Sequence, residues 1–179
     1  LIIRNTIFRY NFAVKGGAFY GEGFRELTIS HSEFHNNEAV IGNAPGAAGG
    51  GAYVGPLPGQ NDTAFIRFEN ILWHHNKAEY GGGLAGITNA LPGEIVDIVN
   101  NTFTLNTPDA YHSDNTLSQV RILNTIMWNN GAASITGANV PVVINSLIQT
   151  PFVGSPGTNT KTIDPIFIDP ASNFRLSSL

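Results

Sequence analysis

Apolar and polar residues alternate in short runs that recur along the chain. One eight-residue pattern, apolar at its first, third and eighth positions, aligns without gaps at residues 1–8, 27–34, 66–73, 96–103, 120–127 and 141–148. Pro141, at the first position of the last run, departs from it. Such alternation is typical of a β-strand with one buried face. Because the run recurs six times, it predicts a solenoid in which each repeat supplies one coil.

Two columns of asparagine accompany the apolar pattern. The first column, at the fifth position of each run, holds Asn5, His31, Asn70, Asn100, Asn124 and Asn145. The second column, six residues further along, holds Asn11, Asn37, Asn76, Asn106 and Asn130. Asparagine tolerates the left-handed backbone of a tight turn, and its amide both donates and accepts hydrogen bonds. Stacked coils bring equal positions together, so we expect each column to form a buried hydrogen-bonded ladder, with His31 standing in for an asparagine.

A third strand is predicted in the early coils after a pair of glycines. The pairs are Gly16-Gly17, Gly50-Gly51 and Gly82-Gly83. Together the patterns predict an all-β fold: a right-handed parallel β-helix of about six coils over residues 1–162, with a tail at residues 163–179 that leaves or caps the helix. Because the first residue already lies in a predicted strand, we expect further coils of a longer protein to adjoin this chain.

Composition excludes several classes of function. Charged residues form only 12% of the chain and 20 residues are glycine, which disfavours a helical bundle. The formal net charge of −4 gives no basic surface for nucleic acid. We find no run of about 18 apolar residues, so no membrane span is expected. The absence of cysteine leaves no disulfide and no thiolate metal site.

Two groups of motifs resemble those of known bacterial proteins. Asn-Glu-Ala at 37–39 with Gly-Gly-Gly-Ala at 49–52, and Asn-Lys-Ala at 76–78 with Gly-Gly-Gly-Leu at 81–84, resemble the repeats of polymorphic outer membrane proteins and related surface β-helix proteins. The tail from residue 163 onward resembles the C-terminal end of secreted β-helix proteins, some of which carry an anchor. The resemblance implies an extracellular or cell-surface location in a group that includes both adhesins and lyases.

An aromatic stripe is the first candidate binding surface. Alternation after the glycine pairs places Phe19 and Tyr53 on the outer face, and Tyr111 extends this column. Aromatic rings stack on the apolar faces of sugar rings, so we expect a ligand-binding stripe formed by Phe19, Tyr53 and Tyr111. The alternative is that the insertions at residues 40–48 and 55–64 cover the stripe, or that another part of the protein does.

A pair of histidines is the second candidate. His35 and His74 share an outward column with Arg9, and His75 follows directly. A stacked histidine pair binds a metal only with further ligands. Since none is evident in the sequence, we expect a solvated ladder, with no metal and no other cofactor.

The remaining charged residues indicate structural roles rather than binding or catalysis. Arg67, Asp97 and Arg121 share one outward column, which we interpret as an exposed charge ladder rather than a uronate-binding site. A loop contains Asp109, His112 and Asp114, for which turn composition is the simpler explanation and a weak calcium or acid–base site the alternative.

The sequence favours a scaffold over an enzyme. Its 13 acidic residues are scattered, whereas β-helix lyases and hydrolases gather carboxylates in one place. We therefore expect an adhesive or glycan-binding surface solenoid whose partner is a polysaccharide or another surface protein. The alternative is a polysaccharide lyase or glycoside hydrolase, for which no catalytic residue can be named.

Overall fold

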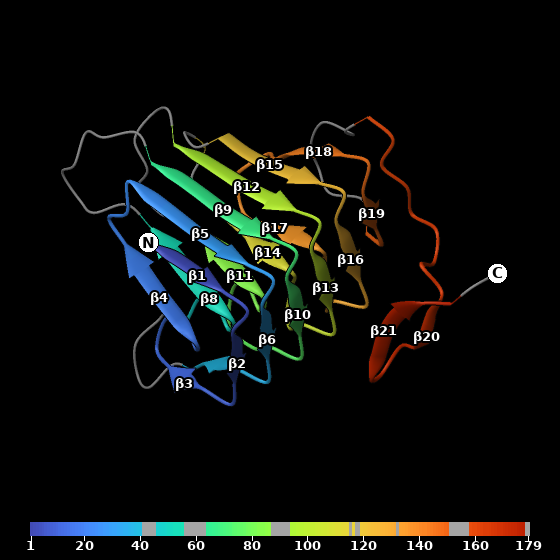
Figure 1. Cartoon of the computed structure of the whole chain (residues 1–179), viewed down its shortest axis with the longest axis horizontal. Coiled ribbons are helices and arrows are strands. Elements are labelled where there is room, and N and C mark those ends of the chain that lie inside the picture. Colours follow the sequence, from blue (N-terminus) through green and yellow to red (C-terminus); the bar gives the residue numbers. More distant parts are fainter. Residues whose placement is uncertain are drawn as a thin grey trace.

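The computed structural model describes residues 1–40, 46–55, 64–86, 94–114, 116, 119–131, 133–150 and 158–177. Every regular element within these ranges is a β-strand, and the main sheets are parallel. Figure 1 shows the strands stacked side by side along the long axis of the molecule. The predicted all-β parallel solenoid is therefore confirmed. No helix in the described part of the chain is long and apolar enough to cross a membrane.

Three parallel sheets form the walls of the solenoid. Sheet one contains β1 (Ile2–Arg4), β5 (Glu26–Ser30), β9 (Phe65–Glu69), β12 (Ile95–Val99), β15 (Gln119–Leu123) and β18 (Val142–Ile144). Sheet two contains β2 (Ile7–Arg9), β6 (Glu33–His35), β10 (Leu72–His74), β13 (Thr102–Thr104), β16 (Ile126–Trp128) and β19 (Leu147–Ile148). Sheet three contains β4 (Phe19–Glu22), β8 (Ala52–Gly55), β11 (Leu84–Gly86), β14 (Tyr111–His112) and β17 (Ile135–Thr136).

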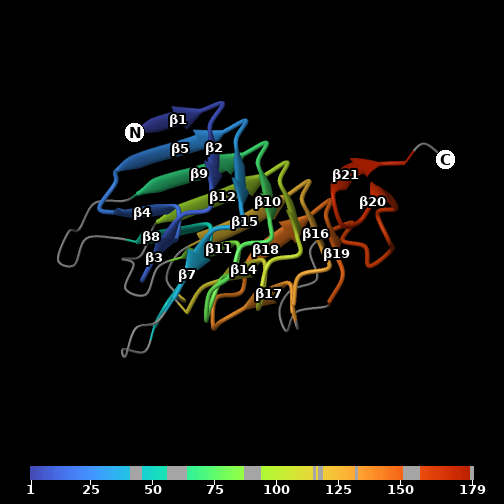
Figure 2. The same cartoon turned by 90° about the horizontal axis from the view of Figure 1, so that it is seen from below.

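Two smaller sheets complete the fold. Strands β3 (Phe12–Ala13) and β7 (Glu38–Ala39) pair in parallel, whereas β20 (Phe167–Asp169) and β21 (Asn173–Leu176) form an antiparallel hairpin. Figure 2 shows this hairpin outside the stacked sheets, at the C-terminal end of the chain. The ring of Phe174 in the hairpin nevertheless lies 5.0 Å from that of His74, so the hairpin contacts the outer face of sheet two.

The core is built from equal positions of successive coils. In sheet two the ring of Phe34 stacks on Trp73 at 4.2 Å, and Trp73 stacks on Phe103 at 5.3 Å. These three side chains are fully buried, as are Ile29 and its sheet-one partner Phe68. Strand alternation places one residue in two inside. The register in sheets one and two pairs the runs position by position as they align in the sequence.

The second column of asparagines forms a continuous chain of hydrogen bonds through the core. The amide Nδ2 of each member donates to Oδ1 of the next, at 2.9–3.0 Å from Asn11 through to Asn130. A second Nδ2 hydrogen donates to a backbone carbonyl, as from Asn106 to Trp73 at 2.9 Å. Because Asn37, Asn76 and Asn106 are fully or almost fully buried, these bonds satisfy amides that water cannot reach.

The first column does not follow the same arrangement, so the expectation of a buried ladder there is wrong. Its six residues adopt a left-handed backbone with φ of 49–54°, and most of their side chains are exposed. Within the described part of this column, Asn70 and His31 share a hydrogen bond of 3.2 Å. The buried hydrogen bonds belong to the residue that follows, as when Oδ1 of Asn101 accepts from the backbone N–H of Ile71 at 3.0 Å. The asparagines therefore act in this turn through backbone conformation.

Candidate functional site

The predicted aromatic stripe is not formed. Sheet three pairs Phe19 with Ala52, and Leu84 with Tyr111, so all four lie on the inner face. Tyr111 is 1% exposed and belongs to the core. Tyr53 alone of the three predicted residues lies in the outer column, and its neighbour there is Tyr20, whose ring is 5.5 Å away. Phe19 and Tyr111 are therefore packing residues. Most of the two insertions lies outside the described residues.

A one-residue error in aligning the glycines explains why Phe19 was expected on the outer face. The shift at Tyr111 is also of one residue, in a coil where no glycine pair marks the turn. The chain has three consecutive glycines at 49–51 and at 81–83 but two at 16–17, which permits two alignments. The structure sets Gly16 level with Gly49 and Gly81, all with φ of 57–71°. Such a left-handed backbone favours glycine, so this turn fixes the register of the strand that follows. A shift of one residue exchanges the inner and outer faces of a strand.

The true outer column of sheet three contains a gap that opens into a cleft. Tyr53, Ala85 and His112 are consecutive in this column, and the small side chain of Ala85 separates the two rings. We call the resulting space of about 220 Å³ the tyrosine cleft. Its lining includes Lys15, Tyr53, Tyr80, Ala85, His112 and Asp114.

Polar groups are held at the edge of the tyrosine cleft by a hydrogen-bonded network. The Nε2 atom of His112 lies 3.2 Å from Asp114, and Nδ1 lies 2.7 Å from the hydroxyl of Thr136. That hydroxyl in turn donates to the buried carboxylate of Asp109, whose pKa is raised by burial. Lys15 Nζ stands 5.1 Å from the centre of the Tyr53 ring, and Tyr80 packs 5.0 Å from His112. The structure therefore joins residues 109, 112 and 114 in one network, of which His112 and Asp114 line the cleft.

The charge column on sheet one forms the ladder of ion pairs that the sequence predicted, but Asp97 at its centre is buried rather than exposed. Asp97 pairs in register with Arg67 on one side and Arg121 on the other. Its carboxylate accepts two hydrogen bonds from Arg121, at 2.6 and 2.7 Å, and one from Arg67 at 3.5 Å. The two arginines cover the aspartate, whose side chain is 3% exposed. The column is a structural ion pair rather than a free anion-binding surface.

On sheet two, the histidine pair has a third neighbour that the sequence prediction missed. The rings of His35 and His74 stack in parallel, with centres 5.0 Å apart. Glu33 Oε1 lies 2.8 Å from His74 Nε2 and 4.0 Å from His35 Nε2. Glu33 precedes His35 by two residues and so shares its outward face, which is the one signal in the sequence that points to it. We call Glu33, His35 and His74 the Glu-His cluster.

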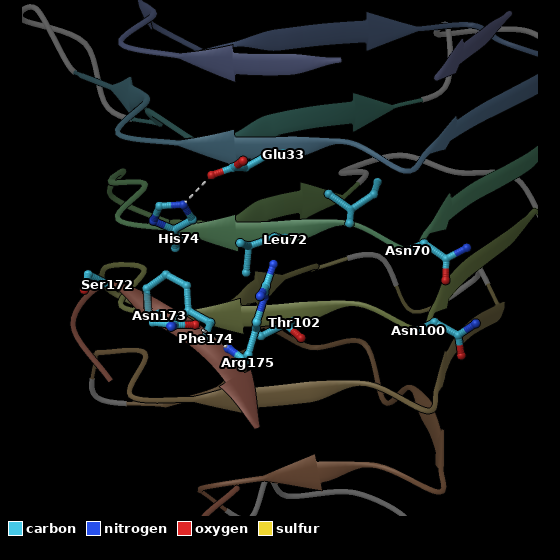
Figure 3. Close-up of a pocket in the computed structure, with 11 residues that line it drawn as sticks. Glu33, Asn70, Leu72, His74, Asn100, Thr102, Ser172, Asn173, Phe174 and Arg175 are labelled. Atoms are coloured by element: carbon cyan, nitrogen blue, oxygen red, sulfur yellow. Dashed lines mark hydrogen bonds and ion pairs between the residues drawn. The ribbon is translucent and has the colours of Figure 1, made fainter. Parts of the chain in front are cut away.

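The Glu-His cluster stands at one end of a groove beneath the C-terminal hairpin. Figure 3 shows Glu33 and His74 on adjacent strands, with Phe174 and Arg175 of the hairpin across from them. The groove has a volume of about 540 Å³ and runs along the outer side of β10 and β13. Burial lowers the pKa of His74, and also that of His75, so both imidazoles favour the neutral form.

Comparison of the chain with models of protein families, with curated proteins and with solved structures finds no match.

Proposed function

We propose that this chain is the carbohydrate-binding part of an extracellular or cell-surface right-handed parallel β-helix protein. Right-handedness is the rule for connections between parallel strands of one sheet. The surface location is supported by the resemblance of the repeats at residues 37–52 and 76–84 to those of bacterial surface proteins.

The observation that carries the proposal is the gap at Ala85 in the outer column of sheet three. Tyr53 and His112 lie two strand spacings apart, or about 10 Å. A ring placed midway lies about 5 Å from each, within the separation of roughly 4.5–7 Å at which stacked rings interact. A pyranose fits this gap because its C–H face is apolar, while its hydroxyls reach the polar atoms of His112, Asp114 and Lys15 at the edge.

The carboxylates that line the cleft favour a binding function over glycoside hydrolysis, because they are too few for the hydrolytic mechanism. A glycoside hydrolase uses two carboxyl groups about 5–9.5 Å apart across the scissile bond. Among the described residues that line the tyrosine cleft, Asp114 supplies a carboxylate, whereas Asp109 is buried and engaged by Thr136. The alternative of a polysaccharide-degrading enzyme therefore needs a second acid beyond the lining residues. Glu79, whose Oε2 accepts a hydrogen bond of 3.2 Å from the lining residue Gly46, is the described residue next to the cleft that carries one.

The test is a glycan array, followed by titration calorimetry with the glycans that bind. Tyr80→Ala removes one wall of the cleft at an exposed position, and we expect it to weaken binding at least 10-fold. Ala85→Val narrows the gap and should have a similar effect. Valine suits a β-strand, and Thr136 is a β-branched residue in the same column two strands further along. Tyr10→Asn is the matched control, because Tyr10 is an exposed tyrosine in a different turn whose left-handed backbone asparagine also adopts.

Three results would contradict the proposal. One is an array without any bound glycan, and another is unchanged affinity in both cleft variants. The third is the release of new reducing ends or unsaturated uronate products from a bound polysaccharide, which would favour the enzymatic alternative.

A further inference from the structure

We propose that Glu33, His35 and His74 form a binding site for a divalent transition metal ion of the Zn²⁺ type. The site is independent of the tyrosine cleft, because it lies on sheet two and shares no lining residue with that cleft. It replaces the solvated histidine pair expected from the sequence, since Glu33 supplies the missing third ligand.

The distances within the cluster suit a metal site. The three candidate ligand atoms, one from each side chain, all lie within 4.8 Å of one another. Metal–ligand bonds of about 2.1 Å place the ligand atoms of a tetrahedral Zn²⁺ roughly 3.4 Å apart, so small rotations of the imidazoles close the site. Two histidines and one glutamate are a ligand set that Zn²⁺ uses when a further position stays open.

Neighbouring side chains contact both imidazoles at Nδ1, the ring nitrogen that does not face Glu33. A metal-bound imidazole carries a proton on its other nitrogen, and a partner for that N–H fixes the orientation of the ring. His75 Nδ1 lies 2.8 Å from His74 Nδ1 and, in the tautomer of His75 that carries its proton on Nε2, accepts the hydrogen bond from that N–H. The amide nitrogen Nδ2 of Asn36 lies 2.9 Å from His35 Nδ1, and a flip of this amide brings its oxygen to the ring, where it accepts the hydrogen bond from the other imidazole. Both nitrogens that face Glu33 are then free to bind the ion.

The cluster is also restrained and partly shielded from solvent. The side chains of His35 and His74 are 14% and 13% exposed. The edge of the Tyr10 ring packs against His35, and Phe174 packs against His74. Ligands whose rotamers are limited in this way lose little freedom on binding a metal. Since Glu33 and His74 line the groove, the open position is reached from solvent.

The experiment is titration of the purified, tag-free chain with Zn²⁺, and separately with Co²⁺, Ca²⁺ and Mg²⁺, by calorimetry. We expect one Zn²⁺ per chain, with weaker or no binding of Ca²⁺ and Mg²⁺, which prefer oxygen ligands to imidazole. Co²⁺ should give the visible absorption bands of a low-coordinate site with nitrogen ligands. His74→Ala and Glu33→Gln should each lower the Zn²⁺ affinity about 100-fold, and His75→Ala about 10-fold or more.

His31→Asn serves as the matched control. It removes an exposed imidazole from the first turn, where asparagine occupies the same position in the other coils, and it should leave Zn²⁺ binding unchanged. Circular dichroism of each variant separates loss of the ion from loss of the fold. If a cluster variant unfolds, the rise in melting temperature of the unmodified chain with Zn²⁺, and its absence with Ca²⁺, is the deciding measurement. The proposal is wrong if Zn²⁺ does not bind, or if folded His74→Ala and Glu33→Gln bind it as tightly as the unmodified chain.

Discussion

Replacing Asn106 by alanine should be among the most damaging single changes in this fold. The side chain of Asn106 makes four hydrogen bonds, accepting two from Asn76 at 3.0 and 3.1 Å and donating to Trp73 O and Asn130 Oδ1 at 2.9 Å each. The residue is fully buried, so water cannot replace these partners. At roughly 1 kcal/mol of net stability for each bond, the loss is about 4 kcal/mol.

The matched comparison is Asn100→Ala in the first column. Asn100 is exposed and has φ of 54°, so alanine loses only the tolerance of asparagine for a left-handed backbone. That cost is about 1 kcal/mol, and Asn100→Gly should be close to neutral because glycine adopts this backbone freely.

Urea denaturation followed by circular dichroism measures both effects. The midpoint should fall much further for Asn106→Ala than for Asn100→Ala, with little change in the slope of the transition. Equal losses at the two sites would refute the reasoning, because they would mean that the exposed turn and the buried ladder contribute alike.

Three further changes test other parts of the structure. Burial raises the pKa of Glu94, whose carboxylate oxygens have no hydrogen-bond partner among the described residues, to about 7. Because the glutamate ionises first in the unfolded chain, the contribution of Glu94 to stability should be most favourable below pH 4.5 and fall by about 2 kcal/mol, after allowance for solvent screening, as the pH rises to 7. The difference between Glu94→Gln and the unmodified chain in pH-dependent melting curves isolates this contribution from those of the other carboxylates. Asp97→Ala should lower the free energy of unfolding in urea by roughly 1–3 kcal/mol, because it removes a buried carboxylate that is bonded to two arginines. A loss below about 0.5 kcal/mol would instead support an exposed ladder. Gly82→Ala places a Cβ 2.4 Å from the backbone oxygen of Thr107 in the next coil and should cost about 3 kcal/mol or more of stability. Gly55→Ala, whose Cβ has its nearest contact at 3.4 Å, should be tolerated. Similar melting temperatures for the two variants would contradict this prediction.

Sheets one and two could be predicted from the sequence because two independent patterns agree there. The apolar alternation gives the strands, and the residue with a left-handed backbone marks the turn between them, as at Asn70 and Asn100. The part that failed in this region was the assignment of the buried hydrogen bonds. An asparagine at a turn can adopt the left-handed backbone conformation or bury a side-chain amide that hydrogen-bonds to the next coil. The sequence does not show which of these two roles Asn100 has and which Asn101 has.

Sheet three was less predictable because glycine carries little information about register. A run of three glycines at 49–51 fits a left-handed turn at Gly49 or at Gly50, and only the contact between coils selects Gly49. The Glu-His cluster was missed for a different reason. Glu33 and His74 are 41 residues apart, and their contact is diagonal across the sheet, so a search along columns of equal position does not find it.

The two sites depend on the same property of the fold, which is the register between coils. His35 faces His74, and Tyr53 faces Ala85, because each pair occupies equal positions on adjacent strands. The buried amide of Asn76 follows His75 directly and is bonded to the coils on both sides. A slip of one residue would turn the cluster inward and bring core residues to the surface. The asparagine chain therefore contributes to both sites without touching a ligand: it excludes the neighbouring registers in which neither the Glu-His cluster nor the tyrosine cleft exists.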